Sequence, residues 1–185
     1  MSDLALILII GVTFWPAVNG QFLFDDIAIE RDPYRIRALR DPRYQGWLGD
    51  LRLWRNDNGR CLTWWTFRRN FDFCQYSTRG YHLTNVAIHA TNVILARHLL
   101  EHWLSWERAL LAAAIFAVHP LQCPSVGYIS GRFGMLAAFF IIASLELFLI
   151  GAWWLIPVAL YLGWKSKQDA LAVPLVMGGL WLVTR

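Results

Sequence analysis

The sequence contains few of the features that mark a zinc site or a nucleic-acid binder. Its three cysteines, Cys61, Cys74 and Cys123, form no CxxC pair and have no neighbouring set of histidines, so the usual spacing of zinc ligands is missing. We expect them to be small buried apolar residues, or a Cys61–Cys74 disulfide if this stretch lies in an oxidising compartment. No recognised nucleic-acid motif accompanies the net charge of +4, so we expect no nucleic-acid partner and attribute the excess to a membrane.

Internal repeats, low-complexity tracts and a cleavable secretory signal are also missing. Residues Met1 to Asp3 lack the positive charge that precedes the apolar part of a signal peptide, and Ala17 to Asn19 is a poor cleavage site. We therefore expect residues 3–20 to be retained as a first membrane span.

Apolar and aromatic residues are abundant instead. Hydrophobic residues make up 57% of the 185 residues, eleven residues are tryptophan, and the mean hydropathy is +0.38. This composition is typical of a membrane protein rather than of a soluble domain of this size. A span needs about 20 mostly apolar residues. Six segments are candidates: residues 3–20, 81–100, 108–123, 133–150, 152–164 and 170–184.

These segments predict one all-helical, polytopic membrane domain over residues 1–185 with about six transmembrane helices. The first loop, residues 21–80, is too long for a simple connector and must contain structure of its own. Apolar residues recur every three or four positions over residues 44–54, so we expect an amphipathic helix on the membrane surface. The alternative is that this apolar stripe packs on a core of the loop itself. A short bundle, residues 81–185, follows.

The second candidate span carries more polar groups than a helix surrounded by lipid can hold. Polar side chains are costly inside a bilayer and generally face the interior of a bundle. We therefore expect this helix to direct its polar residues toward other helices: His82, Asn85, His89, Asn92 and Arg97. The fourth and fifth spans are nearly continuous through Gly151, which predicts a tight helical hairpin.

Alternation of six spans would bring the first, third and fifth connections to one side of the membrane. Their polar residues are Asp25, Asp26 and Arg60 in the first, His119, Gln122 and Arg132 in the third, and Lys165, Lys167, Gln168 and Asp169 in the fifth. Carboxylates and cations therefore converge on one surface. The charges of the short loops are too balanced to fix the orientation in the membrane.

The adjacent carboxylates Asp25 and Asp26 lie where the first span should reach water. They would cap a helix or pair with Arg31. Alternatively, they would supply a general base for an acceptor hydroxyl or ligands for a divalent cation. Because adjacent side chains seldom point to one spot, we expect only one of the two to be catalytic.

Three cations, Arg132, Lys165 and Lys167, lie close to the predicted membrane boundary. A cation at membrane depth costs on the order of 2.5–3.5 kcal/mol, so each needs a reason to be there. Snorkelling of the side chain to the interface is one reason. The other is an anionic ligand such as a lipid phosphate, bound through charge-assisted hydrogen bonds.

In chain order, the polar motifs resemble the membrane part of a known family. They are Phe24-Asp25-Asp26, Arg60-Cys61-Leu62-Thr63 with Thr66-Phe67-Arg68, Tyr81-His82-Leu83-Thr84-Asn85 followed by His89, Phe116-Ala117-Val118-His119-Pro120, Ser130-Gly131-Arg132 and Ser166-Lys167-Gln168-Asp169. The family is the transmembrane O-mannosyltransferases that carry tetratricopeptide repeats, and the resemblance runs from residue 22 to about residue 175. These enzymes belong to the GT-C superfamily, which uses polyprenyl-phosphate sugars as donors.

The resemblance implies a membrane glycosyltransferase that moves a sugar from a polyprenyl-phosphate donor to a hydroxyl acceptor, with the first loop extracytoplasmic. Asp25 or Asp26 would be the catalytic base or would hold a divalent cation. The donor phosphate would be bound by Arg132, Lys165 and Lys167. The other candidate site residues are Arg60, His82, His119 and Asp169. A lone histidine in a helical bundle is more often a packing residue.

The expected location is the bacterial cytoplasmic membrane or the endoplasmic reticulum, with membrane lipids as partners. Two positions depart from the family pattern, since Cys61 replaces a proline and Gln168 replaces a glutamate. The family also continues through further spans and repeats beyond the segment that this chain resembles. The alternative function is therefore a catalytically inactive, GT-C-derived accessory subunit, which would act with other membrane subunits or by self-association.

Overall fold

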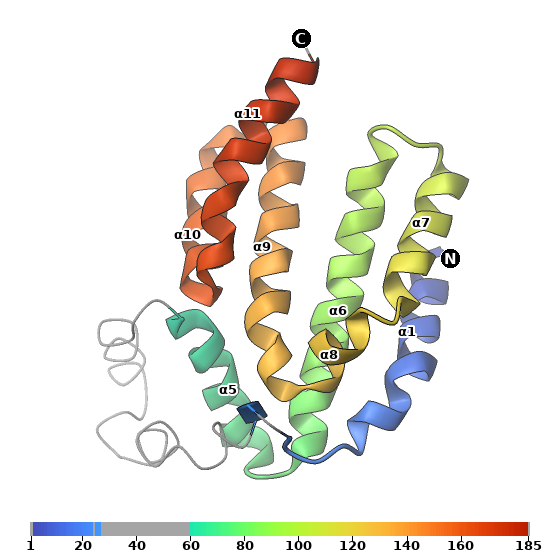
Figure 1. The fold of residues 1–185 in the computed structure, drawn as a ribbon, viewed down its shortest axis with the longest axis vertical. Coiled ribbons are helices and arrows are strands. Elements are labelled where there is room, and N and C mark those ends of the chain that lie inside the picture. Colours follow the sequence, from blue (N-terminus) through green and yellow to red (C-terminus); the bar gives the residue numbers. More distant parts are fainter. Residues whose placement is uncertain (1, 24, 27–59, 185) are drawn as a thin grey trace.

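The described residues of the computed structural model are 2–23, 25–26 and 60–184, and within these ranges the regular structure is entirely helical (Figure 1). The principal helices run alternately down and up the molecule, each coinciding with one predicted span: α1 Ser2–Val18, α6 Thr78–Glu101, α7 Trp106–Val118, α9 Arg132–Leu149, α10 Ile156–Ser166 and α11 Val173–Thr184. The prediction of an all-helical fold is confirmed.

One stretch of the described residues is both long and apolar enough to cross a bilayer. It is Ile129–Leu149, which joins the short 3-10 helix η2 Ile129–Gly131 to α9. Two further apolar stretches, Ser2–Val18 and Gln168–Leu182, are shorter than a full span. The six-span topology therefore stays a prediction.

The polar face of α6 lies inside the bundle, as the sequence predicted. The His89 ring lies 2.9 Å (Nε2 to O) from the Ala117 carbonyl of α7, and Asn92 donates to the Met135 carbonyl of α9 at 2.9 Å. All five polar side chains of this face are less than 10% exposed: His82, Asn85, His89, Asn92 and Arg97. Helix α6 thus joins α1, α7 and α9 through polar contacts.

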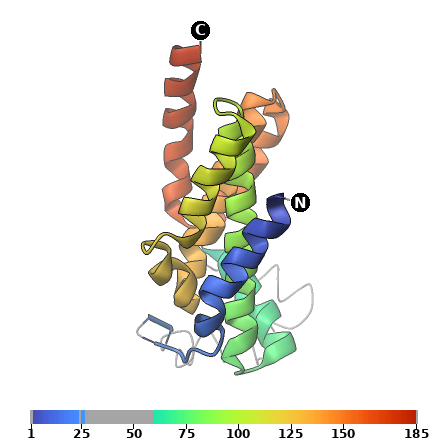
Figure 2. The same cartoon turned by 90° about the vertical axis from the view of Figure 1, so that its right-hand side faces the viewer.

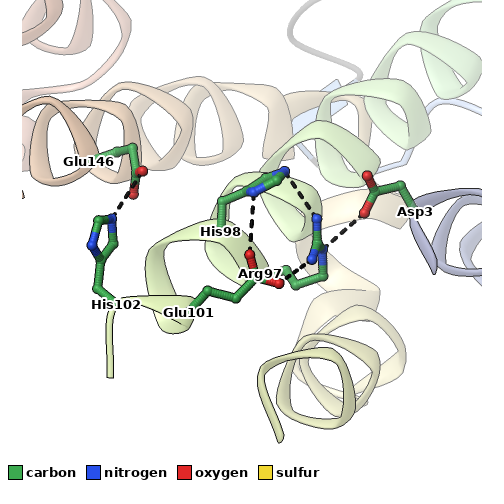
Figure 3. A network of polar contacts seen from close by, with 6 residues as sticks. All are labelled: Asp3, Arg97, His98, Glu101, His102 and Glu146. Carbon is green, nitrogen blue, oxygen red and sulfur yellow. Dashed lines mark hydrogen bonds and ion pairs between the residues drawn. The ribbon is translucent and has the colours of Figure 1, made fainter. Parts of the chain in front are cut away.

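Ion pairs connect the helices at the upper end of α6 (Figure 3). The buried Arg97 guanidinium lies 2.9 Å from the Asp3 carboxylate of α1 and also pairs with Glu101 one turn along α6. His102, just after α6, lies 3.1 Å from Glu146 of α9. These contacts tie three helices together at the end opposite the Asp25-Asp26 pair.

The end of the first loop is a helix that the sequence analysis did not identify. Helix α5 Cys61–Cys74 packs its Trp64, Phe67 and Phe71 side chains inward. Its two cysteines form no disulfide with each other, since they stand 13 residues apart on one helix, roughly 20 Å at 1.5 Å per residue, so the conditional disulfide is wrong. Cys123 is exposed, which corrects the expectation that it is buried. The predicted amphipathic helix over residues 44–54 lies outside the described residues.

The predicted hairpin between α9 and α10 is present. The chain reverses at Gly151, whose φ of 78° lies in the left-handed region that glycine adopts without strain. A short 3-10 helix, η3 Trp153–Leu155, then leads into α10. Helix α10 lies close to α9 at Gly163, where an added Cβ atom would be 3.1 Å from Phe140 Cβ of α9. It would also be 2.8 Å from Ala170 Cβ, in the segment that follows α10.

This close approach predicts opposite effects of alanine at two helical glycines. Gly163→Ala should lower the free energy of unfolding by about 1–3 kcal/mol, because the added methyl overpacks the contact between α10 and α9. Gly134→Ala in α9 meets no atom within 4 Å and should stabilise by about 0.4–1 kcal/mol. Thermal unfolding in detergent measures both changes, and equal midpoints for the two variants would contradict the packing described here.

Candidate functional site

The described part of the first connection contacts both the third and the fifth connections, and in Figure 1 the turn from α10 to α11 lies beside the start of α5. Asp26 of the first connection hydrogen-bonds to η2 in the third, and the Thr63 hydroxyl of α5 donates to the Ser166 carbonyl at the end of α10 at 3.2 Å. These contacts agree with the predicted proximity of the connections, and their position on one side of a membrane stays a prediction.

The two adjacent carboxylates have different environments. Asp26 is 0% exposed, and its carboxylate accepts hydrogen bonds from the backbone N–H groups of Ile129 (3.0 Å) and Ser130 (2.7 Å). Asp25 is exposed. Asp26 therefore anchors the loop, whereas Asp25 is exposed, and the expectation that only one of the two is catalytic stays a prediction.

His82 lies beside this anchor and is 1% exposed. A Cβ atom on Gly20 would stand 3.2 Å from His82 Nε2, so the ring packs directly on the backbone that leads to the carboxylates. Asp26 also acts electrostatically on the ring. His82 is therefore in contact with the loop that carries the site but is closed to solvent.

Arg132, the first residue of α9, points into the protein interior and is 0% exposed. Its Nε donates to Asn85 Oδ1 at 2.8 Å, and its Nη2 donates to the Tyr81 carbonyl at 2.9 Å. Its Nη1 donates to Asn70 Oδ1 at 2.5 Å and to Thr66 Oγ1 at 3.4 Å. Among the described residues, no carboxylate pairs with this cation. Hydrogen bonds to neutral oxygens replace the water that the guanidinium loses on burial.

Aromatic rings enclose the Arg132 guanidinium. The Phe67 ring centroid is 4.4 Å from Arg132 Cζ, within the range of a cation–π contact. Phe133 packs edge-on against Phe67, with ring centroids 5.7 Å apart. The exposed Arg60 lies over the Phe133 ring, with its Cζ 5.4 Å from the ring centroid. Arg60 therefore stays at the surface while Arg132 is sealed beneath.

The cations of the fifth connection lie at the surface. Lys167 Nζ is 2.6 Å from the Asp169 carboxylate, and the Lys167 side chain is 37% exposed. Lys165 Nζ lies 4.4 Å from the centroid of the Trp164 ring. His119 is exposed and accepts a hydrogen bond from the Leu121 N–H (3.2 Å), which closes a local turn.

The divalent cation expected at the Asp25-Asp26 pair stays a prediction. Among the described residues, no group of three or more His, Cys, Asp or Glu side chains is placed to hold a metal ion. Asp26 is buried and each of its oxygens accepts one backbone N–H, so Asp25 is the exposed member of the predicted pair. We therefore derive no step that needs a metal.

An apolar pocket of about 250 Å³ lies between α5, α6 and α9. The Thr66 hydroxyl donates to Thr63 O at 2.7 Å and the Thr91 hydroxyl to Ala87 O at 2.9 Å, so neither donor is free to bind a polar ligand. The remaining lining is hydrocarbon: Leu62, Ile88, Leu136, Phe139 and Phe140. This pocket suits an aliphatic chain and not a sugar.

Several members of the site were missed by sequence reasoning. Thr66, Tyr81 and Asn85 belong to the motifs that carried the family resemblance, but no role followed from that. Asn70 gave no signal, because an amide on an amphipathic helix is as often a solvated residue. The oxygens of these four residues accept hydrogen bonds from Arg132 only because three helices meet there.

The unequal burial of the carboxylates predicts unequal effects on stability. Asp26→Ala should lower the free energy of unfolding by about 1–3 kcal/mol, because two backbone N–H groups lose their acceptor. Asp25→Ala, at an exposed position, should change it by less than about 0.5 kcal/mol. Thermal unfolding compares the two; a larger loss for Asp25→Ala would contradict the assignment of Asp26 as the anchor.

Comparison with known proteins gives relatives of one kind. No family model and no solved structure matches the chain. It is 32% identical over 156 residues to a protein O-mannosyl-transferase of Caenorhabditis elegans, covering 77% of this chain and 22% of that protein. It is 25% and 27% identical to the protein O-mannosyl-transferase TMTC3 of Mus musculus and Homo sapiens, over 75% and 74% of this chain and 16% of each relative. The chain is thus a homologue of the transmembrane, tetratricopeptide-repeat-type O-mannosyltransferases over about three quarters of its length, and it matches only a small part of theirs.

Proposed function

We propose that this chain acts as a GT-C-type membrane glycosyltransferase that moves a sugar from a polyprenyl-phosphate donor to a hydroxyl acceptor on the extracytoplasmic side. The observation that carries the proposal is the division between the two carboxylates. Asp26 is buried and committed to backbone N–H groups, whereas the neighbouring Asp25 is exposed at the same end of the bundle. A protein that only packed against others would not need an open carboxylate beside an anchored one.

Asp25 has the position and chemistry of the general base. In the transfer, the acceptor oxygen forms a bond to the anomeric carbon while the bond from that carbon to the phosphate oxygen breaks. The acceptor hydroxyl must lose its proton, which Asp25 accepts. The electron pair of the broken bond leaves with the polyprenyl phosphate. Asp26 is the poorer candidate, because it is buried and its carboxylate is held by the N–H groups of Ile129 and Ser130.

The leaving phosphate needs positive charge at the same end of the bundle. Lys165 and Lys167 lie in the fifth connection, which α5 reaches through the hydrogen bond of Thr63 to Ser166. Lys167 is partly exposed, and within the described part of the chain it forms an ion pair with Asp169, two residues on. Arg132 uses its guanidinium inside the bundle instead, so we assign the phosphate contacts to the lysines and an interior role to Arg132.

The apolar pocket supports a lipid-linked donor. Its α9 lining, Leu136, Phe139 and Phe140, lies in the middle of the stretch Ile129–Leu149, the part of the described chain that can span a bilayer. Part of an isoprenoid chain would replace lipid hydrocarbon there. The helix α5 that forms one wall of the pocket also contacts the end of α10 next to the lysines.

An accessory or structural subunit is the second candidate, and the surface of α11 favours it. This helix stands apart from α1, α6 and α7, and packs mainly on α9 and the 3-10 helix η4 Gln168–Ala172 (Figure 2). Leu175 and Leu182 are 81% and 71% exposed. In a subunit of a larger complex, this face would pack on a neighbouring membrane helix.

Sugar transfer from polyprenyl-phosphate mannose to a hydroxyl-bearing peptide tests the proposal. Asp25→Asn should lower kcat by about 10²-fold or more, the usual contribution of a general base, without changing thermal unfolding. Asp72→Asn is the matched control, since Asp72 is a partly exposed carboxylate on α5 whose partner is the local Arg69. Full turnover in Asp25→Asn would refute the assigned base. A folded wild-type chain without turnover that co-purifies with a membrane complex would establish the accessory role.

The phosphate assignment predicts a separate effect on the donor. Lys167→Gln should raise the KM for the donor by about tenfold, since a charge-assisted hydrogen bond of about 1.5 kcal/mol is lost. Asp169→Asn frees Lys167 from its ion pair and should leave that KM unchanged or lower. Donor titrations at fixed acceptor measure both. If Asp169→Asn raised the KM as much as Lys167→Gln, the phosphate would not be bound by the lysine.

A further inference from the structure

We propose that Arg132 and Asn85 are positioning residues for the carboxylate pair. Arg132 fixes Asn85, Asn85 fixes the turn Ile129–Gly131, and the N–H groups of that turn hold Asp26, which sets where Asp25 stands. This inference rests on the proposed role of Asp25 as the base. It assigns a task to the most completely buried cation of the described chain, which the transfer mechanism itself does not use.

We call the hydrogen bonds that run from Arg132 through Asn85 and the turn Ile129–Gly131 to Asp26 the relay. Its central residue is Asn85, which is 0% exposed. Its Oδ1 accepts from Arg132 Nε at 2.8 Å. Its Nδ2 donates to the carbonyls of Tyr128 at 2.9 Å and Ile129 at 3.3 Å. The orientation of the amide is thereby determined, because a flipped side chain would set a donor against the guanidinium and an acceptor against two carbonyls.

The turn is held from both sides. Asn85 binds the carbonyl of Ile129, while Asp26 accepts from the N–H groups of Ile129 and Ser130. The turn also has no spare room, since a Cβ atom on Gly131 would stand 2.0 Å from the Ser125 carbonyl oxygen. A shift of the turn therefore shifts both the anchor of Asp26 and the neighbouring Asp25.

A purely stabilising role does not account for this arrangement. Burying a guanidinium costs several kcal/mol, and apolar residues of similar volume often serve stability as well as buried charges do. Arg132 instead reaches α5 at Asn70 and α6 at Tyr81 and Asn85. Such a planar, forked donor fixes directions as well as distances, which is what the position of a base requires.

Asn85→Asp separates the two halves of the relay. The new carboxylate still accepts from Arg132 and adds an opposite charge, so the bundle should remain folded. It has no N–H to donate to Tyr128 and Ile129, and it repels their carbonyls. We expect kcat to fall by about tenfold or more, within the loss that misplacement of a catalytic group produces, with the KM of both substrates within about twofold.

Arg132→Lys is the second variant, and Arg97→Lys is its matched control. Lysine keeps the charge at residue 132 but has no planar, forked set of donors for the four acceptors that Arg132 binds. Arg97 is also buried, on the same helix as Asn85, but it binds Asp3 and Glu101 at the opposite end (Figure 3). Arg132→Lys should lower kcat. Arg97→Lys should lower the unfolding midpoint and leave kcat unchanged.

Amide hydrogen exchange of Ile129 and Ser130 tests the relay without any activity. Exchange should become faster in Asn85→Asp, in Arg132→Lys and in Asp26→Ala, and should keep the wild-type rate in Arg97→Lys. Wild-type exchange in Asn85→Asp would overturn the relay, and wild-type kcat together with faster exchange would overturn the positioning role. A wild-type chain without turnover would overturn the proposed function and the positioning role, whereas the exchange rates would still decide the relay.

Discussion

The lower half of this bundle depends on one buried cation, the Arg132 guanidinium. It joins α5, α6 and α9 through neutral oxygens and an aromatic face, without a carboxylate partner among the described residues. A charge removed from water needs several well-placed dipoles to offset its lost hydration. The amides and carbonyls around it must therefore keep fixed orientations, and the helices that carry them keep fixed positions.

At the opposite end of α6, a second buried guanidinium is stabilised in a different way. Arg97 is nearly as buried as Arg132, but it pairs with the carboxylates of Asp3 and Glu101. An ion pair tolerates small changes in angle, because the attraction depends mainly on distance. A guanidinium bound to neutral oxygens needs directed hydrogen bonds. At the upper end of the bundle, ion pairs therefore hold the helices together. At the lower end, hydrogen bonds also fix the orientation of the groups around Arg132.

Much of the fold could be predicted because it depends on local patterns. Apolar runs of sufficient length gave the principal helices, and the polar residues of α6 predicted its buried face, since such groups are costly in lipid. Helix α5 was missed because its apolar residues, such as Trp64 and Phe67, lie among arginines that suggested a polar loop. Its burial comes from contacts with α6, which follows it directly, and with α9 and α10, which are far away in the sequence.

The sequence by itself determined that the described residues are helical, that successive principal helices alternate in direction, and that carboxylates and cations lie in the odd-numbered connections, because these follow from hydrophobic length and from the reversal of direction at each helix. Only the tertiary structure decided that Asp26 is an anchor and Asp25 an open carboxylate, that Arg132 faces inward, and that Lys167 stays at the surface. The reason is physical. The role of a polar side chain depends on which donors and acceptors neighbouring helices bring within about 3 Å of it, and those neighbours are distant in the sequence.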